Sequence, residues 1–417
     1  MLPRGRAAWA QLAVVAVLAS VAGGMSYARA LAIDPVVYGY GREHGWVTAD
    51  MWFDGDIPNV FNMITSRLAP EHSKTSQHPL MSLAVFFPVY ALKRLADLSS
   101  IEAIRVSWAL LAALSMIALF VLLRLEGLQF FDAAVFTLLG MTSAASVFWY
   151  VVPEAFSIGS LTMIVGLCLV AVARRARSPL VTYVMINAVT LSMTVTNWMV
   201  GIFASIFDLP WRRALIAIAG GLLVVSALWG VQEMVFPEAQ FFVGSNRMLM
   251  FIIDPQPSRM VQVTTAFLSH TVVMPGIETV QRSSRQDVMS VQRSLPGSGS
   301  AAGRLAAGAW VLLLSLGAWA WFSVQAKSPV VRLVGLVVPA QLALHLVFGG
   351  ETFLYSMHFL PLLLVVAGCV TFTRLRVPSL ALAGLVIVVA AVNNDWQFAK
   401  AVELVRIMAH VAAAYPR

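Results

Sequence analysis

The stretch VTADMWFDGDIPNVFNMITSRLAPEHSKTSQHPLMSLAVFFPVYAL, residues 47–92, is the first long polar interruption in an otherwise apolar sequence. Charged residues make up only 12% of the chain, yet acids, bases and histidines gather here. Ionisable groups beside a bilayer are costly, so they indicate a functional site by default; a solvated loop is the alternative. The cluster consists of Asp50, Asp54, Asp56, Glu71, Arg67, Lys74, His72 and His78.

Around this stretch the composition is that of a membrane protein. The 417 residues are 59% hydrophobic, and the mean hydropathy is +0.80. Apolar runs of about 20 residues recur along the chain, which is the length that a helix needs to cross a bilayer. The sequence therefore predicts an all-α polytopic membrane protein embedded in a lipid bilayer.

The net charge of +8 does not indicate a nucleic-acid partner. The arginines stand in short clusters between apolar runs, a pattern typical of membrane topology and of contact with anionic lipids. The two cysteines, Cys168 and Cys369, both lie inside apolar runs. They predict no disulfide, metal cage or redox role.

The N-terminal run, residues 7–33, follows Arg4 and Arg6 and is too long for a cleaved signal peptide. We expect an uncleaved first helix with its N-terminus in the cytoplasm. The run 80–92 is short and contains Pro88, which favours an interfacial segment over a crossing. If it does not cross, the later basic clusters all fall on the cytoplasmic side, and only Lys93 and Arg94 lie outside. Those clusters are Arg124; Arg174, Arg175 and Arg177; Arg212 and Arg213; Lys327; and Arg374 with Arg376.

About eleven transmembrane helices are predicted in one domain, residues 1–417. After the first helix we expect crossings at 103–124, 129–150, 154–173, 178–195, 198–210, 212–235, 304–326, 329–348, 352–372 and 376–393. The pair 178–195 and 198–210 is divided at Thr196-Asn197-Trp198. The extracytoplasmic parts are a first loop at 34–102 with interfacial helices, a second loop at 236–303, and an amphipathic tail at 394–417.

The second loop contains two segments with a local prediction of their own. Met260 to Val273 is expected to form a short amphipathic helix at the interface. Ser294 to Gly303, rich in glycine and serine, has the composition of a flexible linker. The loop also carries four arginines whose guanidinium groups suit phosphate: Arg247, Arg259, Arg282 and Arg285.

On this topology the polar residues collect on the outer side. Glu154, directly after Pro153, and Glu351 with Tyr355 and His358 join the two loops there. The cytoplasmic connections are short and contain little besides arginine. A site open to the outer side would be built from these parts.

Four short motifs in this frame resemble the GT-C superfamily of polytopic glycosyltransferases. They are Asp54-Gly-Asp56, Gln77-His78-Pro79-Leu80 before the short apolar run, Pro153-Glu154, and Phe353-Leu-Tyr355-Ser-Met-His358-Phe-Leu-Pro361. The chain is most similar in style to protein O-mannosyltransferase-like and lipid A aminoarabinose transferase-like enzymes. It departs from them in having one proline after His78 rather than two, and Glu351 near the place where many relatives carry an arginine.

The resemblance implies a glycosyltransferase in the cell inner (plasma) membrane. It would move a hexose or pentose from a polyprenyl-phosphate carrier to a glycan, lipid or protein acceptor on the extracytoplasmic face, with inversion. By the family's pattern Asp56 is the catalytic base and Asp54 its neighbour. Lys74, His72, His78 and the loop arginines are candidates for binding the donor phosphate, and Tyr355 and His358 for binding substrate. Glu154 would bind the acceptor or, with Asp54 and Asp56, a divalent cation such as Mg or Mn.

Structural alternatives remain beside these roles. The acids can cap helices that begin at Ile57 and Ala155, and His78 can form a hydrogen bond in a turn before Pro79. Lys74 and His72 can be solvated loop residues, and Tyr355 and His358 can be packing residues at the interface. The loop arginines can contact lipid headgroups. At the level of function, the alternatives are a multi-pass transporter or flippase of a lipid-linked or amphipathic substrate, and a non-catalytic scaffold subunit. The near absence of charge inside the crossings favours the enzyme over the transporter.

Overall fold

The computed structural model describes residues 6–39, 50–176, 178–244, 251–281, 287–324 and 330–414. These residues are nearly all helical, and seven helical segments are long and apolar enough to cross a membrane. This confirms the predicted all-α class, and the seven segments support the predicted membrane location. The seven segments are α1 (Arg6–Ala32), α4 (Ser100–Leu125), α7 (Ala155–Ala176), α10 (Trp211–Val235), α12 (Ala301–Val324), α14 (Ser356–Gly368) with the 3-10 turns η7 (Thr352–Tyr355) and η8 (Cys369–Phe372), and α15 (Arg376–Ala414).

Four further apolar helices are shorter than the roughly 20 residues that a straight crossing needs. They are α5 (Phe130–Thr142), α8 (Leu180–Met193), α9 (Trp198–Asp208) and α13 (Val331–Val347). A shorter helix, α6 (Ala144–Trp149), directly follows α5. Each of the eleven expected crossings overlaps one of these segments, but only seven segments are long enough by themselves, so the count of eleven stays a prediction.

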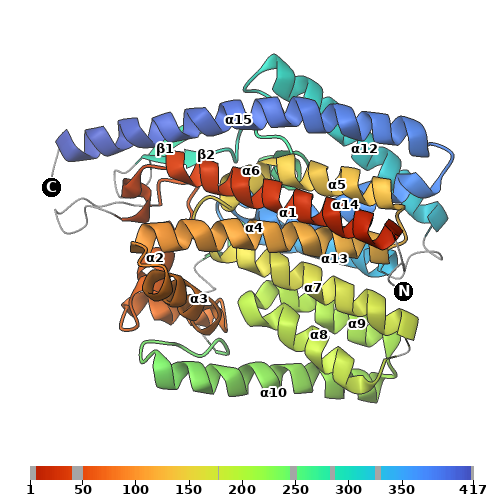
Figure 1. The fold of residues 1–417 in the computed structure, drawn as a ribbon, viewed down its shortest axis with the longest axis horizontal. Helices are drawn as coiled ribbons and strands as arrows, with labels where there is room; N and C mark the ends of the chain where they lie inside the picture. Colours follow the sequence, from red (N-terminus) through yellow and green to blue (C-terminus); the bar gives the residue numbers. More distant parts are fainter. Residues whose placement is uncertain are drawn as a thin grey trace.

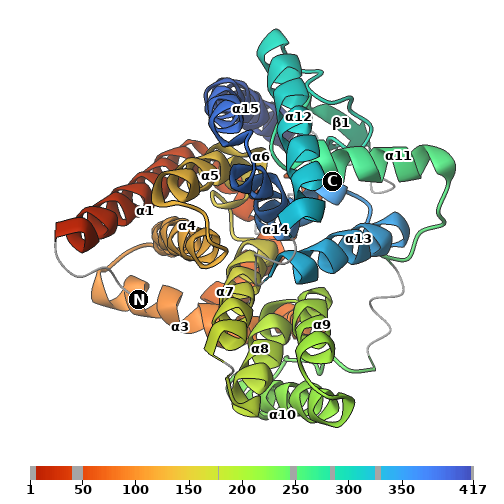
Figure 2. The same cartoon turned by 90° about the vertical axis from the view of Figure 1, so that its right-hand side faces the viewer.

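The long helices lie side by side, and the bundle has two distinct ends (Figure 1, Figure 2). At one end, which we call the arginine end, Arg174 pairs with Asp208 at 2.8 Å and Arg376 pairs with Asp132 at 2.7 Å. At the other, the loop end, α1 finishes and α4 begins, and Arg105 donates to the Ile33 carbonyl at 3.1 Å.

The first loop starts and finishes at the loop end. It contains η1 (Pro35–Tyr38), α2 (Ile57–Thr65), η3 (Pro70–Ser76) and α3 (Met81–Leu95). The residue before α3, Leu80, donates its N–H to the Ser192 carbonyl at 2.8 Å, and α3 ends five residues before α4. The helix contacts α2 and α4 and does not run the length of the bundle. The interfacial position of this helix stays a prediction.

The chain reverses direction between α8 and α9, at the 3-10 turn η4 (Val195–Asn197). The two helices pack closely, because the Asn187 side chain donates to the Ser205 hydroxyl at 2.8 Å and accepts from the Trp198 indole at 2.9 Å. The predicted division of residues 178–210 into two helices is therefore confirmed. Their turn lies at the loop end, beside the first loop.

The second loop packs against the bundle. It contains α11 (Pro257–Thr265), which continues as the π-helix η6 (Ala266–His270), and the hairpin β1 (Glu278–Gln281) with β2 (Asp287–Ser290). The helix expected at 260–273 is thus present, three residues earlier at each end. The prediction of a flexible linker at 294–303 is wrong. The Ser300 hydroxyl bonds the Asn393 side chain at 2.8 Å, and Gly299 and Gly303 pack so closely on α15 that a Cβ would clash.

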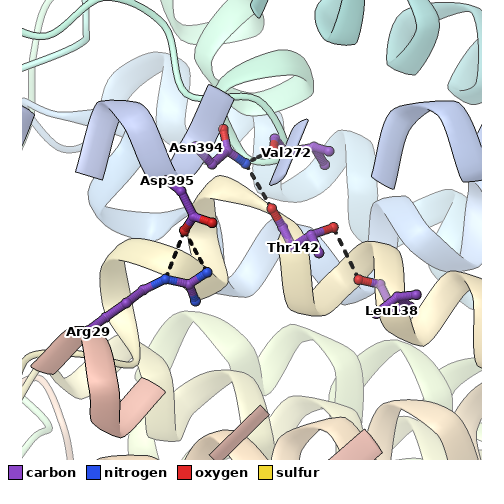
Figure 3. Close-up of polar contacts among 6 residues, drawn as sticks. All are labelled: Arg29, Leu138, Thr142, Val272, Asn394 and Asp395. Carbon is purple, nitrogen blue, oxygen red and sulfur yellow. Dashed lines mark hydrogen bonds and ion pairs between the residues drawn. The ribbon is translucent and has the colours of Figure 1, made fainter. Parts of the chain in front are cut away.

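One helix, α15, replaces the expected crossing 376–393 and its separate tail. A polar junction interrupts its apolar surface: Asp395 accepts from Arg29 of α1, and Asn394 donates to the carbonyls of Thr142 and Val272, each at 2.9 Å (Figure 3). From Arg376 to this junction the helix rises by about 27 Å, close to the thickness of a bilayer core. The rest of α15 extends beyond it, where Phe398 packs on Trp52.

Candidate functional site

A cavity of about 260 Å³ lies at the loop end of the bundle. Five parts of the chain line it: the first loop, the start of α7, the α8–α9 turn, Phe251 of the second loop, and the segment from the end of α13 to η7. Of the nine predicted site residues that the structure describes, six lie here. The lining residues are Asp50, Asp54, Asp56, Lys74, Gln77, His78, Glu154, Phe156, Thr194, Val195, Thr196, Phe251, His345, Phe348, Gly350, Leu354 and Tyr355.

The turn Asp54-Gly55-Asp56 follows directly after aromatic residues that pack tightly in the core. Phe53 and Asp54 both have left-handed backbones, with φ of 50° and 61°, a strained conformation that persists only where the surroundings enforce it. The Phe53 ring lies 5.3 Å from Phe353 and 5.6 Å from Phe148 in edge-on contacts. The neighbouring Trp52 indole donates to the Phe148 carbonyl at 3.1 Å. This packing fixes the direction in which Asp54 and Asp56 leave the backbone.

Asp56 occupies the N-cap position of α2 but makes no capping hydrogen bond. Its Oδ2 instead forms an ion pair with Lys74 of η3, and its Oδ1 accepts from Asn59 at 3.2 Å. Both partners of the pair remain in contact with the cavity. The carboxylate therefore lines the cavity and does not cap the helix.

Glu154 joins the first loop to α7. Its Oε1 accepts from the Ala155 N–H and its Oε2 from the Asp56 N–H, both at 2.8 Å. Burial, and secondarily the negative charge of Asp56, raise the pKa of Glu154 to about 8. The residue is thus a helix cap, as one alternative proposed, and also the anchor of the Asp56 backbone.

The two histidines of the first loop have different positions. His78 lines the cavity, with Nδ1 bonded to the Met193 carbonyl at 2.9 Å, and burial lowers its pKa to about 4. His72 is fully buried and is not among the described residues that line the cavity. Its Nδ1 bonds Ser82 at 2.7 Å and its Nε2 the Ser66 carbonyl at 2.9 Å, so it ties η3 to α3. His78 is available to a ligand only as a neutral hydrogen-bonding group.

The remaining predicted residues that the structure describes lie in the cavity lining or close to it. Tyr355 lines the cavity, whereas His358 is buried behind Phe156, with ring centres 5.2 Å apart. Arg259 donates to the Gly349 carbonyl, next to the lining residue Gly350. Arg247, Arg282 and Arg285 lie outside the described residues.

Glu351 links the site to the second loop. It is buried and accepts from the Ser290 hydroxyl of β2 at 2.5 Å. Burial raises its pKa to about 7. In place of a basic residue, the cavity rim thus has a buried acid that anchors the hairpin.

Sequence reasoning did not assign a site role to several lining residues. Thr194, Val195 and Thr196 line the cavity because the α8–α9 turn lies there. In the sequence, only their position next to Asn197-Trp198, where the division between two helices was predicted, indicated that they lie in a turn. His345 gave a clearer signal, since a histidine inside an apolar run is a functional candidate. Among the described residues no group of three or more His, Cys, Asp or Glu side chains is placed to hold a metal ion, the trio Asp54, Asp56 and Glu154 included.

The scan against protein-family models, the search of curated proteins and the search of solved structures all return no match for this chain. The functional argument consequently rests on the motifs and on the geometry of this cavity.

Proposed function

We propose that this protein is a membrane glycosyltransferase that moves a sugar from a polyprenyl-phosphate carrier to an acceptor on the extracytoplasmic face. The observation that carries the proposal is the meeting of Asp56, Lys74, His78 and Glu154 in one cavity. These residues come from three of the four motifs and from the loop between them.

In this reaction Asp56 is the general base. It takes the proton of the acceptor hydroxyl while the hydroxyl oxygen bonds to the anomeric carbon of the donor sugar. The bond from that carbon to the phosphate oxygen breaks, and the polyprenyl phosphate leaves with the electron pair. A single displacement of this kind inverts the anomeric centre.

The ion pair between Asp56 and Lys74 fits this chemistry only if Lys74 changes partner. A donor phosphate in the cavity competes with Asp56 for the ammonium group and stabilises the charge of the leaving phosphate. The exchange frees the carboxylate to accept a proton at the time when the donor is bound. Arg259 at the rim is a second basic group, and Arg247, Arg282 and Arg285 remain candidates from the sequence.

One observation favours transport of a lipid-linked or amphipathic substrate instead. The helices α8 and α9 are short, with 14 and 11 residues, and their turn lines the cavity, as broken helices do in transporters. A transporter moves its substrate without breaking the anomeric bond. Chemical analysis of the substrate after turnover separates the two functions.

The test is an assay of the purified protein in lipid nanodiscs with a panel of polyprenyl-phosphate-linked sugars, isotopically labelled in the sugar, and a membrane extract as the source of acceptors. We expect release of free polyprenyl phosphate and transfer of the label. Asp56→Asn should remove both, and Glu403→Gln, at an exposed acid on α15, should change neither. An intact donor after incubation, together with movement of labelled lipid across vesicles, would establish the transporter instead.

A further inference from the structure

Four helical segments begin at the cavity, and three of them start with an acid. Asp56 is the N-cap residue of α2, Glu154 precedes α7, and Glu351 is the N-cap residue of η7. The free N–H groups and the dipole at a helix N-terminus favour negative charge. In these three places a carboxyl group of the chain itself stands at the helix start.

The fourth helix, α9, has no acid at its start. It follows the turn Val195-Thr196-Asn197, and Asn197 in the N-cap position makes no capping hydrogen bond with its side chain. Thr194, Val195 and Thr196 all line the cavity. The positive end of the α9 dipole therefore points toward the cavity without a negative charge from the neighbouring sequence.

Buried polar groups without partners surround this N-terminus. Thr194 Oγ1 makes no hydrogen bond within the described part of the chain, and Thr194 is 5% exposed. His345 comes from α13, which contacts α9, and it lines the cavity at 2% exposure. Neither of its ring nitrogens makes a hydrogen bond of ordinary geometry to another described residue. Such groups are costly when left unpaired in a low dielectric, so they point to a polar ligand.

A third unpaired group lies directly behind Thr194. A Cβ built on Gly159 would lie 2.6 Å from His358 Nε2 and 2.8 Å from Thr194 Oγ1, and neither ring nitrogen of His358 has a partner among the described residues. The absence of a side chain at Gly159 lets the hydroxyl and the imidazole approach each other. Two buried polar groups without hydrogen-bond partners among the described residues, the Thr194 hydroxyl and the His358 ring, therefore lie beside Gly159.

The acids of the cavity belong to different elements from these groups. They come from the first loop and the start of α7, whereas the α9 turn and the end of α13 contribute threonine, valine, histidine and phenylalanine. Among these acids, Asp56 forms an ion pair with Lys74. The α9 turn and the end of α13 therefore contribute no carboxylate to the lining, and Lys74 of the first loop lines the same cavity.

We propose that the N-terminus of α9, with Thr194 and His345, is an anion site that receives a phosphate monoester or diester group. Resting on the proposed function, this group is the phosphate of the lipid-linked donor. The helix dipole, the Thr194 hydroxyl and the His345 ring hold the phosphate, together with Lys74, which lines the same cavity. The site does not depend on the loop arginines.

The test uses the full-length protein in nanodiscs and titrates dodecyl phosphate, dodecanol and inorganic phosphate. We expect dodecyl phosphate to bind at least about tenfold more tightly than dodecanol, because only the former has the charge that the site recognises. Displacement of dodecyl phosphate by millimolar inorganic phosphate would show that the site recognises free phosphate; displacement only by a second alkyl phosphate would show that it requires the lipid headgroup. Equal binding of dodecyl phosphate and dodecanol would overturn the proposal.

Variants of Thr196 locate the site. Thr196→Asp places a negative charge at the start of α9, where acids stabilise helices, and it should weaken dodecyl phosphate binding by at least about tenfold by charge repulsion. Thr196→Asn, whose side chain has the same shape as that of the Asp variant, should bind dodecyl phosphate within about twofold of the natural protein, since it adds no charge. If Thr196→Asp does not fold, Thr196→Lys is tested instead, because its positive charge should make it bind dodecyl phosphate more tightly. Unchanged binding in a folded charged variant would refute the assignment. Since no sugar is transferred in this assay, a failed anion site and a failed glycosyltransferase are distinguished.

Discussion

Replacing Asp56 by Asn should separate catalysis from folding. Asn is nearly isosteric and can still accept the hydrogen bond from Asn59, but it cannot take a proton from the acceptor. Loss of a general base removes roughly 10²–10⁴-fold of the rate, which is about 2.7–5.4 kcal/mol of transition-state stabilisation. The assay is the rate of polyprenyl phosphate release at saturating donor.

The cost to folding should be far smaller. The side chains of Asp56 and Lys74 are 36% and 19% exposed, and a partly exposed ion pair contributes about 0–1 kcal/mol. No capping bond is lost, because Asp56 makes none. The melting temperature should therefore fall by less than about 4 °C.

Asp54→Asn is the matched control. Its left-handed backbone, with φ of 61°, is one that Asn tolerates, so this variant should also fold and should lose less activity. Full activity in Asp56→Asn, or a larger loss in Asp54→Asn, would refute the assignment of the base.

Three further predictions concern binding, pH and topology. Lys74→Ala should weaken donor binding, measured by titration of a lipid-linked sugar, and unchanged affinity would return Lys74 to a structural role. Because the pKa of Glu154 is raised from 4.5 to about 8 in the folded protein, its contribution to stability is complete below pH 4.5 and is lost as the pH rises through 8. Thermal melting across this range should show a steeper loss of stability in the natural protein than in Glu154→Gln, which keeps the contribution of Glu351; equal slopes would contradict it. Single cysteines at the exposed Leu68 and Leu95, in a cysteine-free background, should both label from outside the cell, and labelling from opposite sides would show that α3 crosses.

The helices were predictable because each is encoded locally. An apolar run of sufficient length predicts a membrane helix wherever it occurs, and the polar triplet Thr196-Asn197-Trp198 marked the α8–α9 turn. The continuity of α15 was not predictable in the same way. Its Asn393-Asn394-Asp395 segment looks like a helix end, but these side chains bond to Met274, Thr142 and Arg29, contacts that no local pattern contains.

The acids of the candidate site were predictable from the sequence, but the contribution of the α8–α9 turn was not. Asp54, Asp56 and Glu154 stand out because charges are rare in this chain, and the cavity brings them together as expected. The role of His72 depends on Ser66 and Ser82, whose geometry the sequence does not encode locally. The α9 turn reaches the cavity only through tertiary packing of helices distant in sequence. The same holds for Ser294–Gly303, whose glycines serve close packing on α15.

The most direct test of the central claim is native mass spectrometry of the protein extracted gently from its own membranes. A lipid-linked donor requires a polyprenyl-phosphate site, so we expect a bound polyprenyl phosphate or its glycosylated form, reduced in Lys74→Ala. Added donor should displace this lipid and be converted to free polyprenyl phosphate. Preparations that contain only ordinary phospholipids, and that turn over a soluble nucleotide sugar without any polyprenyl phosphate, would contradict the account.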